Sequence, residues 1–299
     1  MQVLRTPDDR FDNLPDWSYE PNYVSDLAGA EGMRVHYVDE GDADAEVTYL
    51  CLHGEPTWAY LFRKMIPVLT AAGGRVVAPD WLGFGRSDKP VDDETYGFHF
   101  HRDMMLAFVE RLDLSNITLV VQDWGGLLGL TLPHAMPERF TRLIIMNTAL
   151  ATGTAPSKGF LAWQAYANAN PDLDVGALMK RSTPGMSDAE AAAYAAPFPS
   201  AAFKAGVRRF PQMVMTNPEM EGVETSRQAL EFWQKQWAGQ TFMAVGKQDP
   251  VLGVEVMQGM ASMIKGCPAP FIIEPAGHFV QEWGDIVATE ALKSFAEHA

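Results

Sequence analysis

The segment at residues 116–130, NITLVVQDWGGLLGL, restricts the possible folds more than any other part of the chain. Its first half is a short apolar run rich in β-branched side chains, which is typical of a buried parallel strand. Its second half changes at once to glycine and leucine, which favours a helix that begins close to the strand. Asp123 stands at the junction, where rigid scaffolds often carry reactive groups. The pattern predicts a nucleophile elbow that presents Asp123 in place of the usual serine.

The rest of the chain alternates between strand-like and helix-like segments. Short apolar runs predict buried strands at residues 47–53, 75–80, 116–123, 142–147, 241–246 and 270–275. Helical spacing follows at residues 57–72, 100–112, 125–135, 254–264 and 280–298. Residues 33–40 instead alternate apolar and polar side chains, which predicts an antiparallel strand. Together these segments predict an α/β fold, with a mostly parallel central sheet flanked by helices.

The alternation stops at residues 152–223, which are alanine-rich, helical in character and interrupted by prolines. Strand-like runs resume after this segment. We therefore expect a core made of residues 1–151 and 224–299, with residues 152–223 inserted as a helical cap. The cap is expected over the carboxyl edge of the sheet, where open α/β sheets bind ligands.

Composition narrows the possible partners and the cellular location. The net charge is −15 and no basic cluster offsets it, which argues against nucleic acid or an anionic membrane as a partner. Cys51 and Cys267 offer neither a disulfide framework nor a metal-binding spacing. No apolar run approaches the ~18 residues of a membrane-spanning helix. We expect a monomeric cytoplasmic protein without metal or cofactor.

Two further polar residues follow predicted strands and suit Asp123 as partners. Asp249 follows the strand at 241–246, and His278 follows the strand at 270–275. A single such acid is usually a solvated turn residue, and a single such histidine is usually an ordinary loop residue. Their agreement with the chain order nucleophile, acid, histidine favours a catalytic triad.

The motif His53-Gly54-Glu55 also follows a predicted strand. Its plain interpretation is a turn. Its functional interpretation is an oxyanion hole, in which the backbone N–H groups of Glu55 and Trp124 receive developing negative charge.

A carboxylate nucleophile is ionised at neutral pH and can displace a leaving group from an sp³ carbon, forming an alkyl ester. His278 would then activate water to hydrolyse the ester, with Asp249 orienting the imidazole. Carbon–halogen cleavage and epoxide opening both fit this scheme. A departing halide needs N–H donors, for which Trp124 and Trp163 are candidates, although a tryptophan such as Trp163 is more often a packing residue. An epoxide needs an acidic O–H donor, for which the candidates are the tyrosines of the cap, Tyr166 and Tyr194.

Motifs along nearly the whole chain resemble the haloalkane dehalogenases of the α/β-hydrolase superfamily. These motifs are LCLHGEPTWAYLFRKMIPV at 50–68, GFGRSDKP at 83–90, VVQDWGG at 120–126, AYAAPFP at 193–199, GQTFMAVGKQD at 239–249 and AGHFVQE at 276–282. They are most similar to the subgroup of the dichloroethane-degrading enzyme. Other subgroups carry asparagine where this chain has Glu55, and place the acid where it has Asn147.

The resemblance implies hydrolysis of a small apolar halogenated substrate with release of halide, and no cofactor. It assigns the nucleophile to Asp123, the base to His278, the acid to Asp249, the halide-binding indoles to Trp124 and Trp163, and a place beside the oxyanion hole to Glu55. It also implies a pocket lined by Phe160, Phe210, Pro211, Val214, Val251 and Leu252.

One segment departs from the pattern of the family. Only twelve residues separate Leu150 from Trp163, fewer than in the typical member, and several of them are small. We expect the shorter segment to open the pocket to longer alkanes. Three alternatives to a haloalkane dehalogenase are an epoxide hydrolase, a fluoroacetate-type dehalogenase and a non-catalytic ligand-binding relative. The second of these carries arginine where this chain has Trp124.

Overall fold

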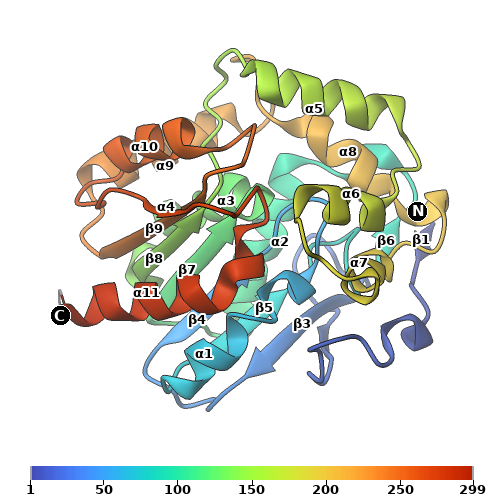
Figure 1. Ribbon diagram of the computed structural model, residues 1–299, viewed down its shortest axis with the longest axis horizontal. Helices are drawn as coiled ribbons and strands as arrows, with labels where there is room; N and C mark the ends of the chain where they lie inside the picture. The colour runs from blue at the N-terminus through green and yellow to red at the C-terminus, as the bar shows by residue number, and fades with distance from the viewer. Residues whose placement is uncertain (1, 298–299) are drawn as a thin grey trace.

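The computed structural model describes residues 2–297, which form an eight-stranded sheet covered by helices (Figure 1). The strand order is β10-β9-β8-β7-β4-β5-β3-β2. The strands are β2 (Asn22–Val24), β3 (Val35–Glu40), β4 (Thr48–Leu52), β5 (Arg75–Pro79), β7 (Ile117–Gln122), β8 (Phe140–Met146), β9 (Gln240–Gly246) and β10 (Phe271–Ile273). A separate two-stranded sheet pairs β1 (Val3–Leu4) with β6 (Lys89–Pro90).

The pairing of the strands follows the hydrophobic pattern. Every residue of β4 and β7 is buried, as expected for parallel strands covered on both faces. The two strands pair in parallel, with Leu50 opposite Leu119. The alternating strand β3 is antiparallel to both β2 and β5, which confirms its prediction. Because the parallel strands run the same way, the segments that follow β4, β7, β8 and β9 all emerge at one edge of the sheet.

Eleven helices accompany these strands in the described part of the chain. They are α1 (Ile66–Ala71), α2 (Phe98–Arg111), α3 (Trp124–Gly129), α4 (Leu132–Ala135), α5 (Lys158–Ala169), α6 (Val175–Ser182), α7 (Asp188–Ala195), α8 (Ala205–Met213), α9 (Val223–Lys235), α10 (Val254–Met263) and α11 (Gly284–Glu297). Helices α1 and α11 pack together, and α2 packs against α3 on the opposite face of the sheet (Figure 1).

Three long helices expected from the sequence are each divided. The segment at 57–72 contains a 3-10 turn (Ala59–Phe62) and then α1, whereas 125–135 contains α3 and then α4. Pro67 and Pro133 stand in the first turns of α1 and α4, where the missing N–H of proline is tolerated, and they prevent one continuous helix. The segment from Val280 begins with a 3-10 turn (Val280–Trp283) before α11, and His298 lies outside the described residues.

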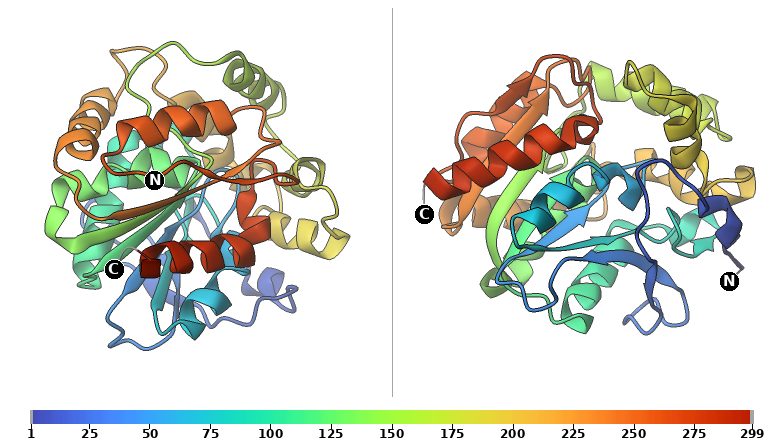
Figure 2. Two further views of the ribbon diagram at one scale, coloured as in Figure 1. Left: turned by 60° about the vertical axis from the view of Figure 1, so that its left-hand side comes forward. Right: turned by 60° about the horizontal axis from the view of Figure 1, so that its bottom comes forward.

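Helices α5 to α8 lie together at one end of the molecule (Figure 2). They pack in pairs, α5 with α8 and α6 with α7. Three of them begin at a residue whose side chain accepts a hydrogen bond from the first turn: Ser157 for α5, Asp174 for α6 and Ser187 for α7. Such caps satisfy backbone N–H groups that the helix itself leaves free, so each helix start is encoded locally. Within residues 2–297, no helix is both long and apolar enough to cross a bilayer.

Candidate active site

Asp123 occupies a sharp turn between β7 and α3, with φ 50° and ψ −123°. Positive φ is unfavourable for a residue with a side chain, and the surrounding close packing holds this conformation. A Cβ atom on Gly125 would lie 1.9 Å from the carbonyl oxygen of Leu52, and one on Gly126 would lie 2.1 Å from Oγ1 of Thr148. The glycines of this sequence therefore allow α3 to begin directly against β4.

The two carboxylate oxygens of Asp123 have different surroundings. Oδ1 accepts a hydrogen bond from the backbone N–H of Glu55 at 2.8 Å. Oδ2 lies 3.6 Å from Nε2 of His278, and both side chains reach the same cavity. The backbone of Asp123 is held as well, because its carbonyl oxygen accepts from the hydroxyl of Thr148 at 2.7 Å. One oxygen is thus anchored, and the other is directed toward the imidazole.

His278 and Asp249 form the second half of the predicted triad. Nδ1 of His278 lies 2.8 Å from Oδ2 of Asp249. Burial would raise the pKa of Asp249, but the charge and hydrogen bond of His278 lower it to about 2. Burial would lower the pKa of His278, but the charges of Asp249 and Asp123 outweigh burial and raise it to about 10. Asp123 and Asp249 together therefore favour the protonated form of His278 in the free site.

Asn147 is a supporting residue that the sequence did not identify as functional. Its side-chain N–H donates to Oδ2 of Asp249 at 2.8 Å, and its side-chain oxygen accepts from the backbone N–H of Gly246 at 2.8 Å. The backbone N–H groups of Val251 and Leu252 donate to Oδ1 of Asp249 at 2.8 and 3.1 Å. Three of these contacts fix the carboxylate of Asp249, and the fourth, from Gly246, fixes Asn147. Two features of the sequence point to this position: Asn147 directly follows a strand, and it stands where the resemblance places the acid of other subgroups.

Gln122 and the side chain of Glu55 were also missed. The amide nitrogen of Gln122 lies 3.0 Å from Nε2 of His278 and donates to the backbone carbonyl oxygen of His278 at 3.2 Å. Gln122 therefore orients the histidine from the side opposite Asp249.

The carboxyl group of Glu55 is buried beside Asp123. Burial, followed by the charge of Asp123, raises the pKa of Glu55 well above its ordinary value. The buried site therefore favours the neutral form of the Glu55 carboxyl group. Both residues lie inside motifs that carry the family resemblance, VVQDWGG at 120–126 and LCLHGEPTWAYLFRKMIPV at 50–68.

A cavity of about 850 Å³ joins these groups to the helices beyond the sheet edge. Its wall includes Asp123, Trp124, Trp163 and His278. Of the six lining residues implied by the resemblance, five line it: Phe160, Pro211, Val214, Val251 and Leu252.

Phe210 does not line the cavity, so this prediction is wrong. The side chain is fully buried, with its ring centre 4.7 Å from that of Trp124 and 4.7 Å from that of Phe84. On α8, the neighbouring residue Pro211 faces the cavity, while Phe210 points into the core behind Trp124. Phe210 supports the indole of Trp124 and is shielded from a ligand by it.

The eight tryptophans of the described chain differ in whether the indole N–H has a protein acceptor and in whether they line the cavity. Trp17 and Trp283 donate to no protein acceptor within residues 2–297 and do not line the cavity. Four donate to protein acceptors at 2.8 to 3.1 Å: Trp58, Trp81, Trp233 and Trp237. Trp124 and Trp163 line the cavity, and neither indole N–H donates to a protein acceptor within residues 2–297. Indole nitrogen is a donor only, so these two groups are available to an acceptor that enters the cavity.

The tyrosines required by the epoxide alternative are poorly placed for it. Tyr194 is fully buried outside the cavity wall, where its hydroxyl contacts Arg63 and Glu282. Tyr166 lines the cavity and keeps its O–H proton while accepting from Arg181 at 3.2 Å, but its side chain is exposed. The donors that reach the cavity beside Asp123 are therefore better matched to a halide than to an epoxide oxygen.

The chain is similar to known proteins along nearly its whole length. Residues 49–285 match the family described as the alpha/beta hydrolase fold. A haloalkane dehalogenase of Psychrobacter cryohalolentis is 45% identical over 288 residues, covering 94% of each chain. Haloalkane dehalogenase 1 of Mycobacterium tuberculosis is 41% identical over 309 residues, covering 99% of each. The structure of haloalkane dehalogenase DpaA from Paraglaciecola agarilytica, described as tetrameric, superposes with a TM-score of 0.97 at 52% identity over 99% of each chain. On this evidence the chain belongs to the haloalkane dehalogenases, within the α/β-hydrolase fold family.

Proposed function

We propose that this chain hydrolyses haloalkanes to alcohol, halide and a proton through an alkyl ester on Asp123. One observation carries the proposal: the free oxygen of Asp123 and two indole N–H groups without protein acceptors, those of Trp124 and Trp163, share one cavity. A nucleophile and halide donors in a mostly apolar cavity are what displacement of a halide requires.

In the first step, Oδ2 of Asp123 attacks the carbon that carries the halogen. The new C–O bond forms as the C–halogen bond breaks, and the bonding electron pair leaves with the halide. The N–H groups of Trp124 and Trp163 receive the halide. Oδ1 stays hydrogen-bonded to the backbone N–H of Glu55, which leaves Oδ2 as the attacking atom.

In the second step, water attacks the carbonyl carbon of the ester. Esterification removes the negative charge of Asp123, one of the charges that raise the pKa of His278. The pKa of His278 then falls, the imidazolium releases its proton to solvent, and the neutral imidazole takes a proton from the attacking water. The backbone N–H of Glu55, which contacts Oδ1 directly, and that of Trp124 hold the resulting oxyanion. Collapse of this intermediate breaks the bond between the carboxyl carbon and the alkoxy oxygen. The alkoxide takes the proton of the added hydroxyl group, which gives the alcohol and restores the carboxylate of Asp123, while Asp249 stabilises the imidazolium.

We further propose that residues 152–223 act as the cap and that the preferred substrates are longer than two carbons. The cavity volume of about 850 Å³ is large for dichloroethane. Part of its wall comes from Thr154, Ala155, Pro156 and Ser157 in the short segment before Trp163. Small side chains there leave room for a longer alkyl chain of the substrate.

The sequence-based expectation of a monomer is at odds with the tetramer described for DpaA. Sedimentation of the purified protein decides between the two states. A cytoplasmic location stays a prediction.

The test is a halide-release screen of 1-bromoalkanes from two to eight carbons, together with 1,2-dichloroethane and styrene oxide. We expect bromide release to increase with chain length before it declines, and no diol from the epoxide. Asp123→Asn is the control for non-enzymatic hydrolysis. Diol formation without halide release would instead identify an epoxide hydrolase.

A further inference from the structure

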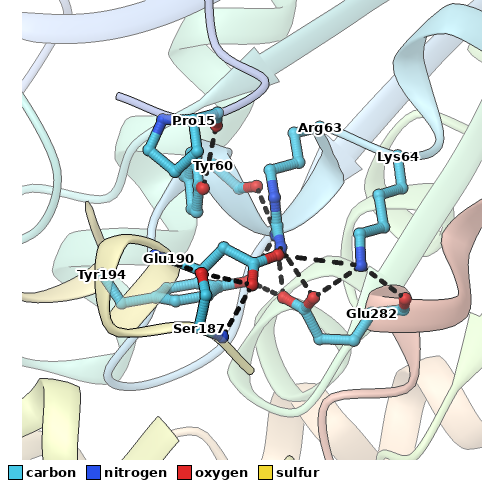
Figure 3. Close-up of polar contacts among 8 residues, drawn as sticks. All are labelled: Pro15, Tyr60, Arg63, Lys64, Ser187, Glu190, Tyr194 and Glu282. Carbon is cyan, nitrogen blue, oxygen red and sulfur yellow. Dashed lines mark hydrogen bonds and ion pairs between the residues drawn. The ribbon is translucent and has the colours of Figure 1, made fainter. Parts of the chain in front are cut away.

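A buried ionic cluster lies outside the reaction cavity and joins three distant parts of the chain (Figure 3). We call it the Arg63 cluster, and it consists of Arg63, Lys64, Glu190, Tyr194 and Glu282. Arg63 and Lys64 follow the 3-10 turn after β4, Glu190 and Tyr194 belong to α7, and Glu282 follows His278 by four residues. The cluster is therefore a direct connection between the core, the proposed cap and the segment that carries the proposed base.

Glu282 is held in the cluster by both its side chain and its backbone. Arg63 binds both of its carboxylate oxygens, Nη1 to Oε1 at 2.8 Å and Nη2 to Oε2 at 2.7 Å. Lys64 donates to Oε2 at 3.1 Å and to the backbone carbonyl oxygen of Glu282 at 3.0 Å. Side chain and backbone are both held, so this point of the chain has little freedom to move.

Helix α7 contributes the remaining contacts. The hydroxyl of Tyr194 donates to Oε1 of Glu282, and Oε1 of Glu190 accepts from Nη2 of Arg63 at 2.9 Å. Glu190 is also held by the start of its own helix, where the backbone N–H of Ser187 donates to Oε2 at 2.9 Å. Arg63 is thus shared between a carboxylate of α7 and a carboxylate next to the active-site segment.

The cluster is too deeply buried to be a surface ion pair. The side chain of Arg63 is 0% exposed and that of Glu282 is 4% exposed. Burial would raise the pKa of Glu282, but the hydrogen bonds and charge of Arg63 outweigh burial and lower it. An ion pair at this depth is a weak source of net stability, and such pairs are better explained by the geometry that they impose.

The geometry imposed here concerns His278. The backbone N–H of Glu282 donates to the carbonyl oxygen of Phe279 at 3.0 Å, which closes a tight turn directly after His278. On the other side, Gln122 donates to the carbonyl oxygen of His278. We propose that Glu282 is a positioning residue for His278. Through the Arg63 cluster, the position of α7 against the core is coupled to the position of the imidazole. This inference rests on the proposed function, because it assigns His278 to ester hydrolysis.

A selective kinetic effect follows from this coupling. Asp123 performs the first step, and His278 acts only in the second. Loss of Glu282 contacts is therefore expected to slow ester hydrolysis and to leave alkylation unchanged. A cluster that merely stabilises the fold would affect neither step in the folded enzyme, or both steps equally.

The experiment is a single turnover of 1-bromobutane with enzyme in excess, quenched in acid at successive times. Bromide measures alkylation, and the mass of the intact protein measures the butyl ester. The variants are Glu282→Gln and Tyr194→Phe. Asp174→Ala is the matched control, because Asp174 caps the neighbouring helix α6 through the backbone N–H of Ala177 and does not contact the cluster.

We expect ester hydrolysis to slow roughly tenfold in Glu282→Gln and severalfold in Tyr194→Phe, because a small displacement of a catalytic group lowers the rate of its step by factors of this size or more. Alkylation should stay within about twofold, and Asp174→Ala should match the unchanged enzyme. If Glu282→Gln does not fold, Tyr194→Phe decides alone. Equal slowing of both steps, or no excess of butyl ester in Tyr194→Phe, would overturn the inference. If the unchanged enzyme releases no bromide, the proposed function itself fails.

Discussion

Nε2 of His278 lies 3.6 Å from Oδ2 of Asp123, close enough for strong electrostatic coupling but longer than a good hydrogen bond. The proposed base and nucleophile are therefore oppositely charged neighbours in the free site. Each chemical step changes the charge of one of them and shifts the proton affinity of the other. In the proposed mechanism this coupling sets the order of the steps, because the histidine becomes a competent base only after the aspartate has reacted.

The first prediction concerns Asp123→Asn. The amide retains the shape of the side chain but has no charge, so the pKa of His278 should fall below the value of about 10 that the carboxylates maintain. Titration of the His278 ring protons by NMR measures this shift. Halide release should disappear in the same variant. An unchanged His278 titration would show that the coupling to Asp123 is weak.

His278→Phe should stop the reaction after one step. Asp123 remains able to attack, so each enzyme molecule should release one equivalent of bromide from 1,2-dibromoethane and gain the mass of the alkyl group. His99→Phe is the control, because His99 is exposed on α2, away from the cavity, and should turn over normally. Continued turnover by His278→Phe is incompatible with the proposed base.

Bromide binding should depend on both cavity indoles. Removing one N–H donor to an anion costs about 1.5 kcal/mol or more, which is roughly a tenfold weaker affinity. Trp163→Phe should therefore raise the bromide dissociation constant at least tenfold in a fluorescence-quenching titration. Trp237→Phe is the control, since the Trp237 N–H already donates to Thr241. Equal quenching in Trp163→Phe and the unchanged protein would remove Trp163 from the halide site.

Asp249 should make stability depend on pH at the acid end. Its pKa in the folded protein is lowered from 3.8 to about 2, so the ionised form is favoured by folding. The contribution is complete above about pH 4 and is lost as the pH falls through 2, with a total of about 2 kcal/mol. Urea unfolding between pH 4 and 2 should therefore show a steeper loss of stability in the unchanged protein than in Asp249→Asn. Parallel curves would contradict the lowered pKa.

The sheet and the triad were predictable because each has a local signature. Buried parallel strands appear as continuous apolar runs, and Asp249 and His278 each follow such a run in the expected order. Phe210 was misplaced because adjacent residues on a helix face different directions, and the sequence does not show which of two neighbours faces the cavity. The structure turns Pro211 toward the cavity and Phe210 into the core.

Contacts between residues far apart in the chain have no local sequence pattern from which they could be predicted. Arg63 meets Glu282 across 219 positions and Glu190 across 127. Neither carboxylate differs in its sequence context from an acid on a solvated surface. Gln122 and Asn147 were overlooked for a related reason, since an amide acquires its role from the partner that the fold brings to it.

The last prediction concerns the tight approach of α3 to β4. Gly125→Ala would place a Cβ atom 1.9 Å from the carbonyl oxygen of Leu52, so the strand or the elbow has to shift. We expect a loss of roughly 3–5 kcal/mol in the free energy of unfolding, together with loss of halide release.

Gly259→Ala is the matched control. A Cβ atom on Gly259 meets nothing within 4 Å, and this position lies inside α10. Alanine there should stabilise the protein by roughly 0.5–1 kcal/mol, because it favours the helix over the unfolded chain. Chemical denaturation of both variants, with halide release from the same preparations, distinguishes a steric requirement at the elbow from a general intolerance of replacing glycine.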